Sequence, residues 1–233
     1  IGLIFQDPQT SLNPILTIGE QLIETIQTHL SLNFNEAKEK AVNLLKEVGI
    51  KEAESRFNNY PHQFSGGMRQ RVVISLALCC EPELLIADEP TTALDVSTQS
   101  QILDLIKRLT KEKNLAVILI THDMGVIAET TNRVAVMKNG DLVEIGSTKE
   151  ILTNPKEVYT KALIASRPST TVRVKKLPTI SDFIEGTVED EVITTSTRKE
   201  LHSDLYKREP LLQVKEVVKD FKLKKGLFEK QQF

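Results

Sequence analysis

The chain has 233 residues, of which 40% are hydrophobic and 27% charged, a composition typical of a globular protein with a buried core. A formal net charge of −2 and a pI of about 6.2 provide no net basic surface for nucleic acid, which is therefore not an expected partner. The two cysteines, Cys79 and Cys80, are adjacent in an apolar run, which suits neither a disulfide framework nor spaced metal ligands and favours a reducing compartment.

The longest apolar runs, around residues 72–80 and 116–120, are much shorter than the roughly 20 residues of a membrane-spanning helix. Any membrane role is therefore expected to come through a partner. No signal peptide opens the sequence, and residues 1–5 resemble the middle of a strand, so we expect the N-terminus to be an arbitrary cut.

Two amphipathic helices are predicted in the first quarter of the chain. The first follows a capping box from Thr17 to Glu20 and carries apolar residues at helical spacing. The second begins near Asn35 and ends at Gly49, where a left-handed C-terminal residue is favoured. Together they predict a helical subdomain.

After Ser65, helices and strands alternate along the sequence. One helix is expected up to about Cys80 and another around residues 98–112. The expected strands lie at residues 84–87, 116–120, 134–137 and 142–145. The first two are wholly apolar, as in a buried parallel sheet, and the last two flank Asn139-Gly140, a strong hairpin signal. This order predicts an α/β fold.

Beyond about Pro168 the chain becomes rich in Thr, Ser, Lys and Glu, which predicts a linker over residues 169–209. Apolar and charged residues alternate again over residues 211–221, where we expect a new strand to begin. The alternative for this last segment is a peripheral C-terminal strand and tail.

A hydroxyl and two glycines, Ser65-Gly66-Gly67, stand immediately before a predicted helix. Exposed backbone N–H groups and the positive end of the helix dipole favour an anion such as phosphate at this position. The alternative is an ordinary serine N-cap followed by a flexible turn.

Two carboxylates, Asp88 and Glu89, follow the first apolar strand, and His122 follows the second. The ends of strands are where α/β sheets bind their ligands. There one acid can hold Mg²⁺, the next can deprotonate a water, and a histidine can contact a terminal phosphate. The alternative is a set of solvated loop residues.

Taken in order, these motifs resemble the ATP-binding proteins of ABC transporters, over about residues 1–167. The corresponding motifs are the Q-loop glutamine at Gln6, the ABC signature at Ser65-Gly66-Gly67, the end of Walker B at Asp88-Glu89-Pro90, the D-loop at Ala93-Leu94-Asp95 and the switch histidine at His122. Asp7-Pro8 with Ser11-Leu12-Asn13-Pro14, and Asn154-Pro155 with Tyr159-Thr160, are similar to the oligopeptide and dipeptide importer family.

The resemblance implies a P-loop NTPase-like α/β domain over residues 1–168, with a helical signature subdomain at about 14–80. It implies ATP and Mg²⁺ as ligands, with Glu89 as general base and His122 on the γ-phosphate. Asp88 and Gln6 would contact Mg²⁺. The residues implied to contact nucleotide are Gln6, Ser65, Gly66, Gly67 and Asp95.

The sequence contains no G-x-x-x-x-G-K-[ST], and none of its ten glycines is followed by lysine. The resemblance therefore implies an ABC domain lacking its N-terminal part, and a fragment that is inactive alone. Residues 210–233 resemble the start of a second ABC domain, with Phe221 near the adenine, which implies a tandem protein.

The implied partners are a second nucleotide-binding domain in a head-to-tail pair, transmembrane permease subunits and, indirectly, an extracytoplasmic solute-binding protein. The implied location is the cytoplasmic face of the membrane, as a peripheral subunit. Nickel or another small solute is the alternative to a peptide. One alternative function is a soluble ABC ATPase of DNA repair or chromosome organisation, but the sequence has no sustained heptad pattern. Another is a non-catalytic module, which the presence of both Glu89 and His122 disfavours.

Overall fold

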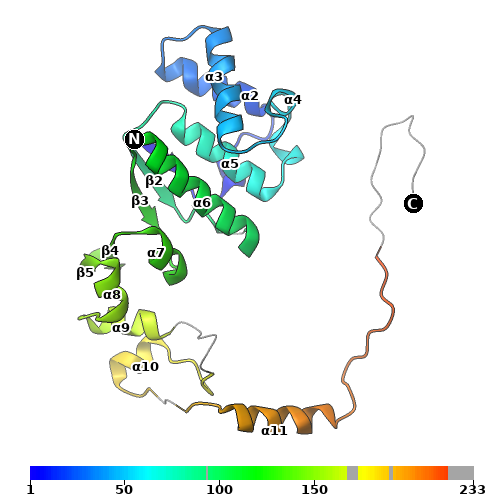
Figure 1. Ribbon diagram of the computed structural model, residues 1–233, viewed down its shortest axis with the longest axis vertical. Coiled ribbons are helices and arrows are strands. Elements are labelled where there is room, and N and C mark those ends of the chain that lie inside the picture. Colours follow the sequence, from blue (N-terminus) through cyan, green and yellow to red (C-terminus); the bar gives the residue numbers. More distant parts are fainter. Residues whose placement is uncertain (93, 167–172, 189–190, 220–233) are drawn as a thin grey trace. The chain divides into compact units, whose positions relative to one another are not determined.

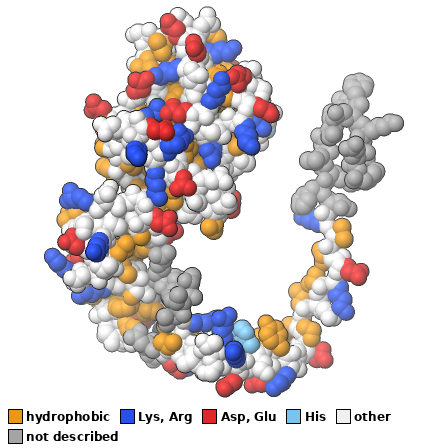
Figure 2. Space-filling model, viewed as in Figure 1, with side chains coloured by type: hydrophobic (Ala, Val, Ile, Leu, Met, Phe, Trp, Pro, Cys, Tyr) orange, Lys and Arg blue, Asp and Glu red, His pale blue; other side chains and the backbone are white. Residues whose placement is uncertain are grey.

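The computed structural model describes residues 1–92, 94–166, 173–188 and 191–219 (Figure 1). The chain divides into two compact units, residues 1–164 and 165–233. Over the first unit, the face seen in Figure 2 carries acidic and basic side chains interspersed with one another. Within the described ranges, no helix is both long enough and apolar enough to span a membrane.

The first unit contains a parallel sheet of three short strands, β1 (Gly2–Ile4), β2 (Leu84–Asp88) and β3 (Ala116–Ile120), in the order β1-β2-β3. Leu3 pairs with Ile86, which pairs in turn with Ile118. The predicted α/β class and the strand positions are confirmed. Because all three strands run in the same direction, the segments that leave their carboxyl ends share one edge of the sheet.

The helices of this unit are short to medium in length. They are α1 (Pro8–Ser11), α2 (Ile18–His29), α3 (Phe34–Glu47), α4 (Ala53–Arg56), a 3-10 turn (Pro61–Gln63), α5 (Gly66–Leu78), α6 (Val96–Lys113), α7 (Met124–Thr130), α8 (Thr148–Thr153) and α9 (Val158–Ala165). The core is a cluster of buried side chains from α2, α3, α5, α6 and one face of the sheet.

One expectation about the sheet is corrected by the burial pattern. Ile4, Leu85 and Ala87 are buried on the face that joins the core. On the opposite face Ile118 and Ile120 are 50% and 48% exposed, so β3 is not the fully buried strand that its apolar run predicts. A run of five apolar residues does not report how many faces of a strand are covered, and among the described residues this face has no covering layer.

The predicted helical subdomain is confirmed. Thr17 and Glu20 form the expected reciprocal capping box at the start of α2. α3 begins at Phe34, after a second capping box between Asn33 and Glu36, and Gly49 beyond its end has φ +82°. This left-handed conformation is the one that the sequence pattern requires there.

The predicted hairpin is also confirmed, as β4 (Arg133–Lys138) and β5 (Asp141–Ser147), a two-stranded antiparallel sheet. Asn139 and Gly140 both have positive φ, as a type I′ turn requires. A bulge at Val136 and Met137 shifts the register of the pair. Buried Val134 and Val136 pack with Ile151 of α8 in a small second cluster.

The second unit contains α10 (Ile180–Glu185) and α11 (Thr195–Tyr206), neither of which has a buried residue. Linker composition does not predict either helix; both begin at threonine N-caps, a local signal of helix formation. Residues 211–219 form neither helix nor strand, and the rest of the expected final strand, including Phe221, lies outside the described residues. The linker and the second domain remain predictions.

Candidate functional site

The structure brings three of the sequence-predicted site residues into direct contact at the carboxyl edge of the sheet. Gln6 lies two residues beyond β1, Glu89 follows β2 directly and His122 lies two residues beyond β3. Parallel pairing of these strands places the segments that follow them side by side. Gln6 and His122, which are 83 and 33 positions away from Glu89 in the sequence, therefore meet at its carboxylate.

The carboxylate of Glu89 accepts hydrogen bonds from three side chains. Nδ1 of His122 lies 2.8 Å from Oε1. Nε2 of Gln6 donates to Oε2 at 2.6 Å, and the hydroxyl of Thr92 donates to the same oxygen at 2.9 Å. The side chain of Glu89 is 21% exposed and that of His122 is 77% exposed, so the cluster opens toward solvent on the histidine side.

The backbone at Glu89 is in the left-handed region, with φ +43°. This conformation is unfavourable for a residue with a side chain and persists where surrounding contacts hold it. The N–H of Glu89 donates to the carbonyl of Ile120 at 2.9 Å, which ties the end of β2 to the end of β3. Pro90 follows and is buried, so the chain turns sharply at the site.

These contacts define the charge state of the site. Hydrogen bonds from His122, and then from Thr92, lower the pKa of Glu89 below its ordinary value, against the opposing effect of partial burial. Glu89 is therefore ionised near neutral pH, and an ionised carboxylate only accepts hydrogen bonds. In this hydrogen bond the proton is therefore on Nδ1 of His122, which donates to Oε1.

Asp88 and Gln6 are the residues that fit the predicted Mg²⁺ ion. Asp88 is the last residue of β2 and is half-buried, and Gln6 directs its amide nitrogen to Glu89, so its amide oxygen remains available as a ligand. Among the described residues no group of three or more His, Cys, Asp or Glu side chains is arranged to hold a metal. Proteins commonly bind Mg²⁺ through one or two carboxylates, with waters and substrate phosphates as the other ligands.

The serine-glycine motif forms the N-terminus of α5. Ser65 is the N-cap, and its hydroxyl accepts from the N–H of Met68 at 3.3 Å. Gly66 and Gly67 occupy the first two helical positions, where backbone N–H groups have no partner within the helix. Ser65 and Gly66 are exposed, so both the anion-binding and the N-cap interpretations are compatible with this geometry.

Asp95 is the N-cap of α6 and lies close to the serine-glycine motif. Its carboxylate accepts from the N–H and the hydroxyl of Thr98, at 3.0 and 2.7 Å, and these bonds, the hydroxyl first, lower the pKa of Asp95. A Cβ at Gly67 would lie 2.4 Å from the methyl carbon of Thr98. The first turns of α5 and α6 are therefore in close contact. Ala93 of the predicted D-loop lies outside the described residues.

Thr92 is the site residue that sequence reasoning did not identify. Its hydroxyl contacts the carboxylate of Glu89, which is three positions earlier in the chain. The available signal was local: a Glu-Pro pair predicts a turn, and a hydroxyl at the fourth position of a turn can reach back to the first side chain.

The fold defines an ATP-binding domain of the ABC transporter type. The family described as "ABC transporter" matches residues 1–92. Among solved structures, a dimeric post-hydrolysis state of the ATP-binding cassette MJ0796 bound to ADP and Pi has a TM-score of 0.55 and 32% sequence identity, covering 63% of this chain and 62% of that one. The predicted ABC domain fold is confirmed.

Two curated relatives are similar to this chain at the sequence level. The glutathione import ATP-binding protein GsiA of Salmonella typhimurium strain LT2 is 46% identical over 229 residues, which are 98% of this chain and 36% of that protein. The oligopeptide transport ATP-binding protein OppD of Bacillus subtilis strain 168 is 54% identical over 169 residues, 72% of this chain and 47% of that protein. The chain thus spans about a third to a half of the length of these relatives.

Proposed function

We propose that the chain is part of an ATP-binding and ATP-hydrolysing subunit that energises an ABC importer, and that Glu89 is the general base of hydrolysis. The observation that carries this proposal is the position of the Glu89 carboxylate, held between Gln6, Thr92 and His122 at the carboxyl edge of a parallel sheet. A carboxylate in this position can orient and deprotonate a water molecule for attack on a phosphate.

The other residues have complementary roles in the proposal. Asp88 and the amide oxygen of Gln6 hold Mg²⁺, which neutralises charge on the phosphates when it is bound. His122, whose side chain is 77% exposed, contacts the γ-phosphate of ATP. The N–H groups at the start of α5, with Ser65, contact the nucleotide of an opposing domain.

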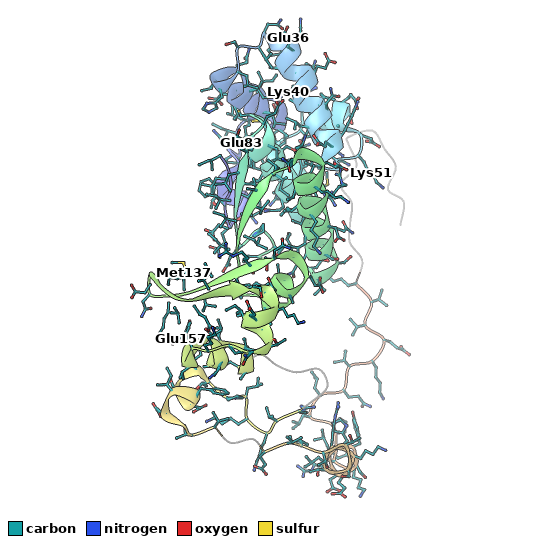
Figure 3. The ribbon with its side chains drawn as sticks, turned by 60° about the vertical axis from the view of Figure 1, so that its left-hand side comes forward. Glu36, Lys40, Lys51, Glu83, Met137 and Glu157 are labelled. Carbon is teal, nitrogen blue, oxygen red and sulfur yellow. The ribbon has the colours of Figure 1, made fainter. Side chains whose placement is uncertain are left out.

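The substitution Glu89→Gln tests the central role. It keeps the size and shape of the side chain but replaces the carboxylate with an amide, which cannot act as the base, so we expect ATP turnover by the native protein to fall by about 10²- to 10⁴-fold. The control is Glu83→Gln, because Glu83 is exposed and immediately precedes β2, at the opposite end from Glu89 (Figure 3). Turnover by Glu89→Gln equal to that of Glu83→Gln would contradict the proposal.

The proposed partners follow from the orientation of the serine-glycine motif. Ser65 and Gly66 are exposed at the N-terminus of α5, which suits pairing with a second nucleotide-binding domain in a head-to-tail dimer. We further propose transmembrane permease subunits, and through them an extracytoplasmic solute-binding protein, which would place the protein at the cytoplasmic face of the membrane. Nucleic acid has no part in this proposal.

Oligopeptides or dipeptides are the proposed cargo. The similarity to GsiA and OppD, named for glutathione import and oligopeptide transport, supports this class. The match to GsiA extends over 98% of the chain whereas that to OppD covers 72%. We also propose that residues 169–209 form a linker and that residues 210–233 begin a second ABC domain.

We expect the 233-residue chain by itself not to hydrolyse ATP, because its sequence contains no G-x-x-x-x-G-K-[ST] to hold the β- and γ-phosphates. The measurement is phosphate release by the purified chain at saturating ATP and Mg²⁺, with its Glu89→Gln variant as the background. Turnover that depends on Glu89 would show that the chain holds the phosphates by other residues.

A further inference from the structure

Thr92 donates hydrogen bonds to both the backbone and the side chain of Glu89. Its backbone N–H donates to the carbonyl oxygen of Glu89 at 3.1 Å, and its hydroxyl donates to Oε2 of the Glu89 side chain at 2.9 Å. The two bonds close a four-residue turn that starts at the left-handed Glu89 and passes through buried Pro90. Backbone and carboxylate are thereby fixed relative to each other by a single residue.

The donors around the carboxylate are distributed unequally. Oε2 accepts from both Gln6 and Thr92, whereas Oε1 accepts from His122 alone. A carboxylate oxygen offers about two lone-pair positions. Oε2 is therefore fully occupied, and the unoccupied position of the carboxylate lies on Oε1, beside the exposed imidazole of His122.

From this arrangement we propose that Thr92 is a positioning residue that, together with Gln6, occupies Oε2 and thereby assigns proton acceptance to Oε1. The inference rests on the proposed role of Glu89 as general base. In the reaction, a water donates one hydrogen bond to Oε1. As the water oxygen bonds the γ-phosphorus, its proton moves to Oε1 and the bridging P–O bond breaks, with its electron pair leaving on ADP.

The geometry explains why one oxygen is selected. General base catalysis requires the accepting atom to lie within hydrogen-bond reach of the proton and on the line of attack. A carboxylate free to rotate would present either oxygen, and only some of its orientations would be productive. Two donors on Oε2 and one on Oε1 restrict that rotation, and His122 then lies next to the atom that receives the proton.

A purely structural role for Thr92, as part of the turn before α6, predicts a different outcome and can be separated by substitution. Thr92→Val keeps the shape and the backbone N–H but lacks the hydroxyl, and Thr92→Ser keeps the hydroxyl but lacks the methyl group. Thr92→Ala is a second hydroxyl-free variant in case valine is poorly accommodated in the turn.

The test measures kcat and KM for ATP in the native protein and its variants, together with nucleotide affinity measured by equilibrium titration. We expect Thr92→Val and Thr92→Ala to lower kcat by about tenfold, the effect of one hydrogen bond to a charged group, with KM and nucleotide affinity within twofold of the original protein. Thr92→Ser should restore kcat. In a Glu89→Gln background, Thr92→Val should have no further effect.

A readout independent of turnover is the ¹³C NMR signal of the Glu89 carboxyl carbon at fixed pH, assigned with Glu89→Gln. It should shift in Thr92→Val and remain in place in Thr92→Ser. The inference is overturned if the hydroxyl-free variants keep the kcat of the native protein, or if Thr92→Ser and Thr92→Val lower kcat equally. In either case a strong loss of kcat in Glu89→Gln would leave the proposed function intact. Full turnover by Glu89→Gln overturns the proposed function itself.

Discussion

At Gly67, the absence of a side chain permits close contact between two helices. A Cβ there would lie 2.4 Å from Cγ2 of Thr98, closer than real contacts allow. Thr98 cannot readily turn away, because its hydroxyl donates to Asp95 at 2.7 Å. At the neighbouring Gly66, a Cβ would meet only Leu94, at an ordinary 3.5 Å.

Gly67→Ala should therefore destabilise the protein by about 1–3 kcal/mol, the typical effect of overpacking. Gly66→Ala, the matched control, should be neutral or slightly stabilising, because alanine favours the helix. Urea unfolding followed by circular dichroism measures both. Equal effects of the two substitutions would show that the contact between Gly67 and Thr98 relaxes without cost.

At the scale of single elements, the helix caps are where sequence and structure agree most closely. In α2, the carboxylate of Glu20 accepts from the backbone N–H and the hydroxyl of Thr17, both at 2.7 Å. These bonds hold the pKa of Glu20 below its ordinary value of 4.5, the backbone bond having the larger effect. The folded protein thus favours the ionised carboxylate.

This lowered pKa predicts how α2 responds to acid. The contribution of the ionised carboxylate is fully present above pH 4.5 and is lost as the pH falls through the lowered folded value. Glu20→Gln should melt at a lower temperature than the original protein at pH 7, and the two should converge in stronger acid. Glu24→Gln, at an exposed position of the same helix, is the control. A difference that persists unchanged in acid would mean that the charge of Glu20 is unimportant.

At the scale of the first unit, two arginines connect the C-terminus of α3 to α5 and α6. Arg71 of α5 donates to the carbonyl of Val48 at 2.5 Å, and Arg108 of α6 donates to the carbonyl of Glu47 at 2.6 Å. Burial, and then the nearby Arg108, lower the pKa of Arg71. The carbonyls at the end of a helix carry partial negative charge, which offsets the unfavourable proximity of the two cations.

Arg71→Met should weaken this attachment, because it removes the bonds to Val48 and to Gln101 while keeping much of the apolar side chain. We expect a loss of about 1–3 kcal/mol in the free energy of unfolding, and faster hydrogen exchange at the last amides of α3. Arg133→Met, at an exposed position of β4, is the control. Unchanged exchange in α3 would show that other contacts hold the end of this helix.

Much of the first unit was predictable because its signals are local. The capping box at Thr17, the glycine after α3 and the Asn-Gly hairpin each depend on residues within a few positions of one another. Apolar runs located β2 and β3 for the same reason. The exposure of Ile118 was not predictable, because the residues of a strand do not indicate which of its two faces is covered by another layer.

The sequence by itself determined the strands and the longer helices of the first unit, the resemblance to the ABC family and the residue types suited to phosphate chemistry, because these depend on spacing and composition. Only the tertiary structure decided that Gln6, Thr92 and His122 all converge on the carboxylate of Glu89, and that two of them share one oxygen. Two of these three contacts join residues far apart in the chain, and strand pairing sets their distances. The geometry of hydrogen bonds between residues far apart in the sequence depends on tertiary packing, which no local sequence pattern specifies.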